Sequence, residues 1–190
     1  MQRGRFAESI REANRALKLD PLSLRYQRNL GRRLYMGRKY DQAIEQFIKT
    51  LELDANYART HEWLADTYEL KGMQKETVAA WSAALSATHE EELARILEKA
   101  YVSSGFDAAK HALWQKKLEK LHQRAAREYV LPMDFAEAYF RLGQTEQALM
   151  WLEKACEERS GDVLVVKVDP FFESLRSHPR FDEIVRCLGQ

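Results

Sequence analysis

Side chains able to do acid–base, nucleophilic or metal chemistry lie in this 190-residue sequence without the spacings that such chemistry needs. There is no glycine-rich phosphate loop, no Gly-x-Ser-x-Gly, no His-Glu-x-x-His and no EF-hand loop. His111 and His122 share one face of a predicted helix, but eleven residues at about 1.5 Å rise separate them by about 16 Å. His61 is interpreted as an ordinary polar residue. We therefore expect no enzyme activity, no metal site and no cofactor.

A run of basic residues between Lys110 and Arg127 is the next candidate for chemistry. It contains Lys110, Lys116, Lys117, Lys120, Arg124 and Arg127. Only Glu119 opposes them within the run. Such a run can contact phosphates, so an accessory nucleic-acid-contacting domain is one alternative function. The other interpretation is the solvated back of a helix whose Leu113, Leu118 and Leu121 face inward.

The overall charge does not favour nucleic acid or membrane as the partner. The formal net charge is +1 at pH 7, which argues against strong general affinity for polyanions. No stretch approaches 18 consecutive apolar residues, and Gln2 to Arg5 lead into an amphipathic stretch rather than a signal peptide. Cys156 and Cys187 form no Cys-x-x-Cys motif, which predicts a reduced, cytoplasmic protein.

The stretch from Leu30 to Ala55 predicts two short helices joined by a tight turn at Gly37 and Arg38. The second helix carries a stripe of residues three or four apart, namely Tyr40, Ala43, Phe47, Thr50 and Leu51. Gly31 and Ala43 are small, so the two backbones can approach closely where they cross. Because neither helix can bury its stripe alone, the pair needs further copies to pack against.

Those copies recur at a fixed spacing along the chain. Each apolar position of this stretch has a counterpart 34 residues further on: Leu64 for Leu30, Tyr68 for Leu34, Trp81 for Phe47 and Leu85 for Leu51. A helix–turn–helix unit at a period of about 34 residues is the tetratricopeptide signature. With Leu30-Gly31, Tyr40 to Ile44, Leu51 to Asp54 and Leu17 to Pro21, the sequence resembles a tetratricopeptide-repeat (TPR) protein over most of its length. The Trp residues Trp63, Trp81 and Trp151 are interpreted as core.

The resemblance implies an all-α, right-handed superhelical solenoid of about four and a half units with a C-terminal helical cap. The array is expected over residues 1–162, as a half repeat at 1–23 and repeats at 24–57, 58–90, 91–128 and 129–162. The cap is expected over 163–190. Within it, Val163 to Val168 is predicted to be extended, Asp169-Pro170 to begin a short helix, and Phe181 to lie in a final helix.

The stretch from Tyr129 to Gly189 resembles the C-terminal end of bacterial TPR regulators, in which the array follows a winged-helix, kinase or cyclase domain. This resemblance implies the sensory or interaction part of a regulatory protein, and the chain is expected to be a fragment because it opens within a repeat.

In TPR arrays the first helix of each unit lines a concave face. The resemblance therefore implies a non-catalytic scaffold that binds a protein or peptide there. The implied positions are Arg25, Arg28, Arg32, Tyr35, Arg59, Glu62, Asp66, Glu69, Glu92, Arg95, Lys99, Val102, Val130, Met133, Glu137 and Phe140. They form a basic, an acidic and a second basic band.

A self-association module is the remaining alternative. Phe6, Ile10, Ala13 and Leu17 lie at helical spacing near the N-terminus. In a complete repeat a preceding helix would cover one side of this stripe. Two copies could cover it instead by pairing across a two-fold axis, which would give a homodimer.

Overall fold

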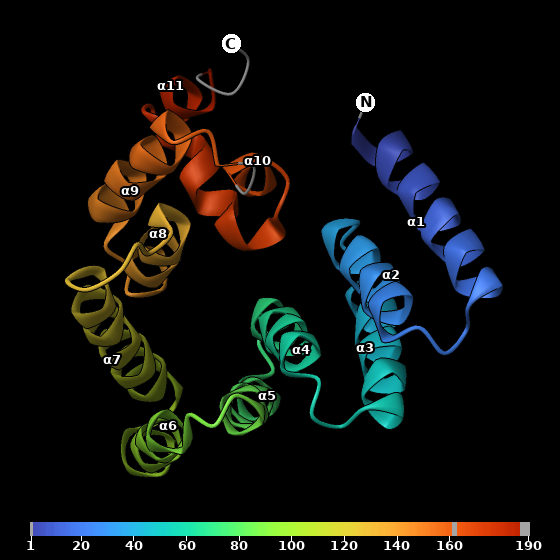
Figure 1. Cartoon of the computed structure of the whole chain (residues 1–190), viewed down its shortest axis with the longest axis horizontal. Coiled ribbons are helices and arrows are strands. Elements are labelled where there is room, and N and C mark those ends of the chain that lie inside the picture. The colour runs from blue at the N-terminus through green and yellow to red at the C-terminus, as the bar shows by residue number, and fades with distance from the viewer. Residues whose placement is uncertain (1, 161–162, 187–190) are drawn as a thin grey trace. The chain divides into compact units, whose positions relative to one another are not determined.

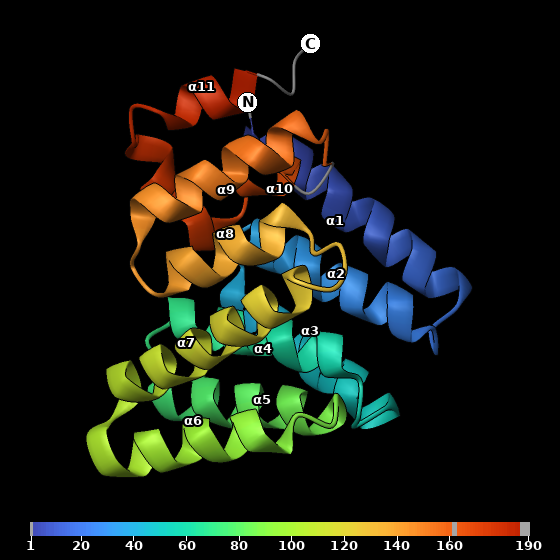
Figure 2. The ribbon, with the colours of Figure 1, turned by 60° about the vertical axis from the view of Figure 1, so that its left-hand side comes forward.

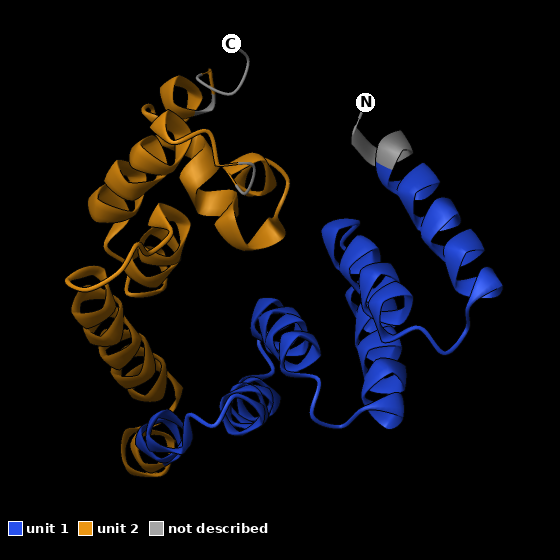
Figure 3. Cartoon of the chain, in the orientation of Figure 1, with its two compact units in different colours: residues 1–98 blue, residues 99–190 orange. Residues whose placement is uncertain are grey.

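The computed structural model describes residues 2–160 and 163–186, and the side chains of residues 6–160, 163–184 and 186. Every regular element in these residues is a helix, which confirms the all-α prediction. The chain divides into two compact units, Met1–Glu98 and Lys99–Gln190 (Figure 3). The predicted division of the chain into an array and a cap at residue 162 stays a prediction.

The N-terminal unit contains a series of helices, of which α1 to α4 each pack on the next one along the chain (Figure 1). They are α1 (Gln2–Leu19), α2 (Leu24–Met36), α3 (Tyr40–Leu53), α4 (Ala58–Leu70), α5 (Gln74–Ala87) and the first part of α6 (Glu91–Ser104). α2 also contacts α4, so the first helices of successive pairs are neighbours. The helix pairs expected from the repeat period are therefore confirmed as α2–α3 and α4–α5.

A close helix crossing of this unit lies between α2 and α3, at Gly31. A Cβ atom at Gly31 would lie 2.6 Å from Cδ1 and 3.0 Å from Cζ of Phe47, whose side chain is fully buried. Real Cβ atoms do not approach carbon so closely, so only glycine lets the Phe47 ring come this near to the α2 backbone. The sequence prediction of close approach at this small residue is confirmed.

Each turn between the two helices of a pair contains one residue in the left-handed backbone conformation. In three of these turns the residue is a glycine: Gly72 at φ of 72°, Gly105 at 83° and Gly143 at 73°. In the α2–α3 turn the residue is Arg38, at φ of 59°, while the preceding Gly37 has an ordinary φ of −79°. Glycine adopts this conformation freely, whereas a side chain makes it costlier. The α2–α3 turn is thus the one that departs from glycine at the left-handed position.

The C-terminal unit contains the rest of α6 and, among the described residues, six further regions of helix. They are α7 (Phe106–Ala125), α8 (Pro132–Arg141), α9 (Thr145–Glu157), the short α10 (Val163–Val166), the 3-10 helix η1 (Pro170–Ser177) and α11 (Phe181–Arg186). Figures 1 and 2 both show α8 alongside α9. Pro132 occupies the first position of α8, where its missing N–H costs no helical hydrogen bond. α7 ends at Ala125, three residues before the expected end of the repeat at residue 128.

The prediction of an extended segment at Val163 to Val168 is wrong, because residues Val163–Val166 form a turn of helix. Val163 and Val166 are each 1% exposed, and α10 packs on α9. Three residues apart, they share one face of a helical turn, and burying that face outweighs the strand preference of β-branched residues. No strand for them to pair with occurs in the described residues.

The segment after α9 covers the apolar faces of α8 and α9. Its buried side chains and those of the two helices form one core of Ala136, Leu149, Leu152, Cys156, Val166, Phe172, Leu175, Phe181 and Ile184. Asp169 caps η1 as predicted, because its Oδ1 accepts a hydrogen bond of 2.9 Å from the backbone N of Phe171. The described part of the expected helical cap therefore packs on the last helix pair, while residues 187–190 lie outside the described residues.

Ion pairs fasten α11 to α9. The guanidinium of Arg180 donates to Glu153 at 2.6 Å and to Glu146 at 2.8 Å. Hydrogen bonding to Glu153, followed by the charges of both carboxylates, raises the pKa of Arg180 above its ordinary value. His178 Nε2 lies 3.2 Å from the other oxygen of Glu146. These contacts hold the end of the segment on the outside of α9.

The sulfur of Cys156 is buried 3.0 Å from the carbonyl oxygen of Ile184. Cys156 is disulfide-bonded, which does not support the predicted reduced state. The other cysteine of the sequence, Cys187, lies outside the described residues. Across the described part of the chain, no helix is both long and apolar enough to cross a membrane.

Candidate functional site

Arginines and aromatic rings meet where α2 and α4 lie side by side. Arg25, Arg28 and Arg32 are three and four residues apart, so all three lie on one face of α2. Arg28 Nη1 donates a 2.9 Å hydrogen bond to the hydroxyl of Tyr57, and its guanidinium carbon lies 5.5 Å from the Tyr57 ring centroid. The guanidinium of Arg32 lies 5.3 Å from the Trp63 ring. We call these five residues the arginine–aromatic face.

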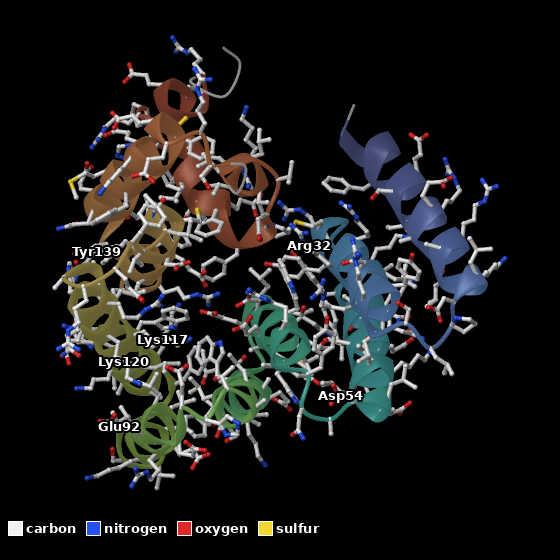
Figure 4. All side chains as sticks on the ribbon, viewed as in Figure 1. Arg32, Asp54, Glu92, Lys117, Lys120 and Tyr139 are labelled. Carbon is white, nitrogen blue, oxygen red and sulfur yellow. The ribbon has the colours of Figure 1, made fainter. Side chains whose placement is uncertain are left out.

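The helix pairing explains why these side chains meet. Tyr57 is the residue immediately before α4, and Trp63 lies in its second turn, so α4 presents both rings toward α2. Cation–π contact and the Tyr57 hydrogen bond restrict the rotation of both arginines. Figure 4 shows Arg32 on α2 within this packed region. The face is therefore a set of cations whose positions are fixed by the neighbouring helix.

Tyr35 does not belong to this face, although it was expected to line the groove. Its side chain is 0% exposed, and its ring lies edge-on to Trp63 at 5.3 Å and tilted to Tyr40 at 6.1 Å. The expectation of an open groove position is wrong for Tyr35. A bulky ring in the last turn of α2 is better buried between three helices than left in water, and here it packs against the ring of Trp63.

Acidic residues continue the surface along α4. Glu62 pairs with the exposed Arg59 at 2.9 Å, one turn away. Asp66 and Glu69 are half-buried. The spacings of four and three residues keep the three carboxylates on one face of α4. Elsewhere on the same helix, burial raises the pKa of Tyr68, and the nearby Glu76 raises it further.

The predicted groove residues on α6 are exposed. Glu92, Arg95, Lys99 and Val102 all face solvent, and Val102 is 86% exposed. Arg95 Nε donates to the carbonyl of Glu91 at 3.4 Å, a local contact that fixes little. Arg95 belongs to the N-terminal unit and Lys99 to the C-terminal unit.

The side chains in and just before α8 that were expected to line the groove pack against other parts of the same chain. Phe140 packs on Phe171 at 5.2 Å and on Phe172 at 5.0 Å, and Met133 packs against the core of the C-terminal unit. Val130 is buried. These contacts come from the segment after α9, whose return over α8 could not be read from the repeat pattern. Binding of a partner by Met133 or Phe140 stays a prediction.

Arg141 is a buried cation that the sequence interpretation missed. Its side chain is 3% exposed, and its guanidinium carbon lies 4.5 Å from the Trp114 ring and 4.0 Å from the Phe171 ring. Nε donates to Glu137 at 2.8 Å. Arg141 thus joins α7, α8 and η1. An arginine in the last turn of a helix usually extends into solvent, so only its three-dimensional neighbours reveal this role.

The basic run on α7 is partly neutralised within the chain. Lys116 pairs with Glu119 at 3.0 Å and Arg124 with Glu128 at 2.8 Å. Lys117 lies 4.5 Å from the Trp114 ring; Figure 4 shows Lys117 on α7. Contact with nucleic acid through this helix stays a prediction.

The histidines show no arrangement for metal binding. His122 Nε2 is 3.2 Å from the Tyr139 hydroxyl, His111 is exposed, and His61 contacts the carbonyl of Ala55 at 2.9 Å. Among the described residues, no group of three or more potential ligands could hold a metal ion.

The N-terminal stripe is partly covered by α2. Phe6, Ile10, Ala13 and Leu17 are all half-buried. A Cβ atom at Gly37 would lie 3.4 Å from Cδ1 of Ile10, which places Ile10 over the end of α2. Self-association through this stripe stays a prediction.

Comparison with known proteins gives a match in the C-terminal unit. The tetratricopeptide repeat model matches residues 133–162, a range that contains α9 and nearly all of α8. Together with the helix pairs of the structure, this match supports a TPR-type protein, and a TPR repeat suggests a protein-interaction scaffold. No curated protein matches the chain.

Proposed function

We propose that this chain is a non-catalytic scaffold that binds a protein or peptide partner through the arginine–aromatic face and the exposed charges beside it. The observation that carries the proposal is the fixing of Arg28 and Arg32 over Tyr57 and Trp63. Arginine, tyrosine and tryptophan are the residues that most often dominate binding energy at protein interfaces. The tetratricopeptide match supports the same class of function.

The fixed arginines favour binding because their side-chain freedom is already reduced. A flexible arginine loses rotamer entropy when it binds a partner, at a cost of about 0.5–1.5 kcal/mol. An arginine already held over a ring loses less.

We further propose that the chain is the interaction or sensory part of a bacterial regulatory protein acting in the cytoplasm, as the resemblance of residues 129–189 implies.

Site-specific photo-crosslinking tests the location of the binding surface. Benzoylphenylalanine at Arg25, which is exposed on α2, should crosslink a partner, whereas the same group at Lys49, exposed on α3, should not. Equal crosslinking from both positions would refute the assignment.

A charge-reversed variant tests the arginines themselves. Arg28→Glu with Arg32→Glu should abolish the crosslink from Arg25 while the far-ultraviolet circular dichroism is unchanged. Arg33 is exposed on α2 and outside the arginine–aromatic face, so Arg33→Glu with Arg15→Glu carries the same charge change as a control. Loss of the crosslink in the control alone would contradict the proposal.

A further inference from the structure

The buried sulfur of Cys156 lies where α9 meets the final helix of the C-terminal unit. Cys156 is 4% exposed, and its Sγ atom is 3.0 Å from the carbonyl oxygen of Ile184 on α11. This sulfur is disulfide-bonded, and the sequence contains two cysteines. A sulfur buried in the core cannot bond to a second copy unless that core opens. Within the chain, the other cysteine is Cys187.

The position of Ile184 keeps Cys187 close to the Cys156 sulfur. Cys187 follows Ile184 by three residues. Three residues span at most about 11 Å when fully extended, and less in any other conformation. Because the Ile184 carbonyl is in contact with the Cys156 sulfur, this short link is enough to bring the two cysteines together. Cys187 itself lies outside the described residues.

We propose that Cys156 and Cys187 form a disulfide that acts as a redox switch and controls whether α11 stays on α9. α11 is a helix of six residues, which is too short to be stable without contacts to the rest of the protein. The disulfide closes a loop of about thirty residues that includes α10 and η1, and a closed loop leaves the detached state of α11 much less freedom. Reduction restores that freedom.

The other contacts of α11 are few. Phe181 and Ile184 are buried against the core of the C-terminal unit, and Arg180 pairs with Glu146 and Glu153. The two carboxylate side chains are 65% and 39% exposed, so water and salt weaken these ion pairs. In the reduced protein, detachment of α11 therefore breaks two apolar contacts and a partly exposed ion-pair network, with no covalent bond to prevent it.

Thiol–disulfide exchange with a dithiol operates the switch. A thiolate of the dithiol attacks the sulfur of Cys187, because the sulfur of Cys156 is buried. The S–S bond breaks, and its electron pair passes to the Cys156 sulfur, which then takes up a proton. The second thiol of the reductant attacks the mixed disulfide, which releases Cys187 as a thiol and converts the reductant into a disulfide. Oxidised glutathione reverses the exchange.

A switch suits the location that the proposed function gives this chain. Disulfides in a reducing cytoplasm are usually transient and catalytic or redox-sensing rather than permanent. Only this cytoplasmic setting rests on the proposed function. The pairing of the two cysteines and the release of α11 do not depend on it.

Peptide mapping without reductant tests the pairing on the full chain. Trypsin cleaves after Lys154, Arg159 and Arg186, so the disulfide should join the peptide of residues 155–159 to that of residues 187–190. This joined peptide should come from protein purified as a single chain and should disappear after treatment with dithiothreitol. Two free thiols in the protein oxidised with glutathione, or a bond between identical peptides of two copies, would overturn the proposal.

Hydrogen exchange tests the release of α11. Its backbone amides should exchange at least about tenfold faster in dithiothreitol than in oxidised glutathione. Cys187→Ser, which leaves Cys156 in the core, should exchange fast in both buffers. Arg180→Gln removes the ion pairs but keeps both cysteines, so it should retain the difference between the two buffers. Unchanged exchange of α11 on reduction, or an equal difference in Cys187→Ser, would refute the switch.

The crosslink from Arg25 tests the proposed function separately, because it involves neither cysteine. If reduction leaves the exchange of α11 unchanged while Arg25 crosslinks a partner and Lys49 does not, the switch is wrong and the proposed function stands. If the crosslink is equal from Arg25 and Lys49, the proposed function is wrong, whatever the two cysteines do.

Discussion

The contact of Gly31 with Phe47 gives the sharpest test of how the α2–α3 pair is built. Gly31→Ala adds one methyl group that would lie 2.6 Å from Cδ1 of a fully buried ring. Overpacking of this kind costs about 1–3 kcal/mol. Replacing glycine by alanine inside a helix gains about 0.5–1 kcal/mol through backbone entropy. Overpacking is the larger effect, so the free energy of unfolding should fall by about 1–2 kcal/mol.

Urea denaturation followed by circular dichroism measures this loss, and a double-mutant cycle assigns it. Phe47→Leu removes the ring that the methyl group meets, so Gly31→Ala should cost at least about 1 kcal/mol less in the Phe47→Leu background than in wild type. A change in the midpoint with an unchanged slope would locate the effect in stability rather than in compactness.

Ala65 supplies the matched control, because it follows Gly31 by one repeat period, at the equivalent place on α4, and already carries a Cβ atom. Ala65→Gly should lose about 1 kcal/mol, mainly from helix propensity. The reasoning would be refuted by a Gly31→Ala protein more stable than wild type, or by strict additivity with Phe47→Leu.

Three further predictions concern other parts of the chain. Thr60→Val should raise the free energy of unfolding by about 1 kcal/mol, since the buried Thr60 hydroxyl has no hydrogen-bond partner among the described residues. Glu137→Ala should lower it by about 2–3 kcal/mol, because the buried Arg141 guanidinium loses its carboxylate; thermal melting measures both. Light scattering at about 10–100 μM should show a dimer for wild type and a monomer for Phe6→Glu with Ile10→Glu, because burying a large apolar side chain gains about 1.5–3 kcal/mol.

Controls for these predictions come from matched positions. Thr50→Val should not stabilise, because the Thr50 hydroxyl donates to the Gln46 carbonyl at 2.9 Å. Glu119→Ala should change stability little, since its pair with Lys116 is exposed. Ala7→Glu with Asn14→Glu adds the same charge to exposed positions of α1 and should leave a dimer intact. A wild-type chain that is monomeric throughout would exclude association through α1.

The helix pairs of the fold were predictable because burial in a helix follows a fixed period along the chain. Phe47 and Trp81, one repeat period apart, are both buried in the second helices of their pairs. The period also predicted that Arg28 and Arg32 lie on one helix face.

Their ring partners were not predictable, because spacing along the chain does not say which side chains of another helix lie opposite. The same limit hid Arg141, whose neighbours Trp114 and Phe171 are far from it in sequence. At Val163–Val166, the strand preference of β-branched residues predicted an extended segment, but the residues form a helical turn because this lets them pack on α9.

The serial packing of the N-terminal unit has a consequence for hydrogen exchange. α1 packs chiefly on α2, whereas α2 packs on α1, α3 and α4. Separating α1 from the unit therefore breaks one main helix contact, while opening α2 breaks three. Backbone amides of α1 can exchange with solvent through a local detachment that leaves the rest of the unit folded, whereas those of α2 need a larger and rarer opening. Protection against exchange is thus set by the number of helical neighbours, and it rises from the first helix to the second.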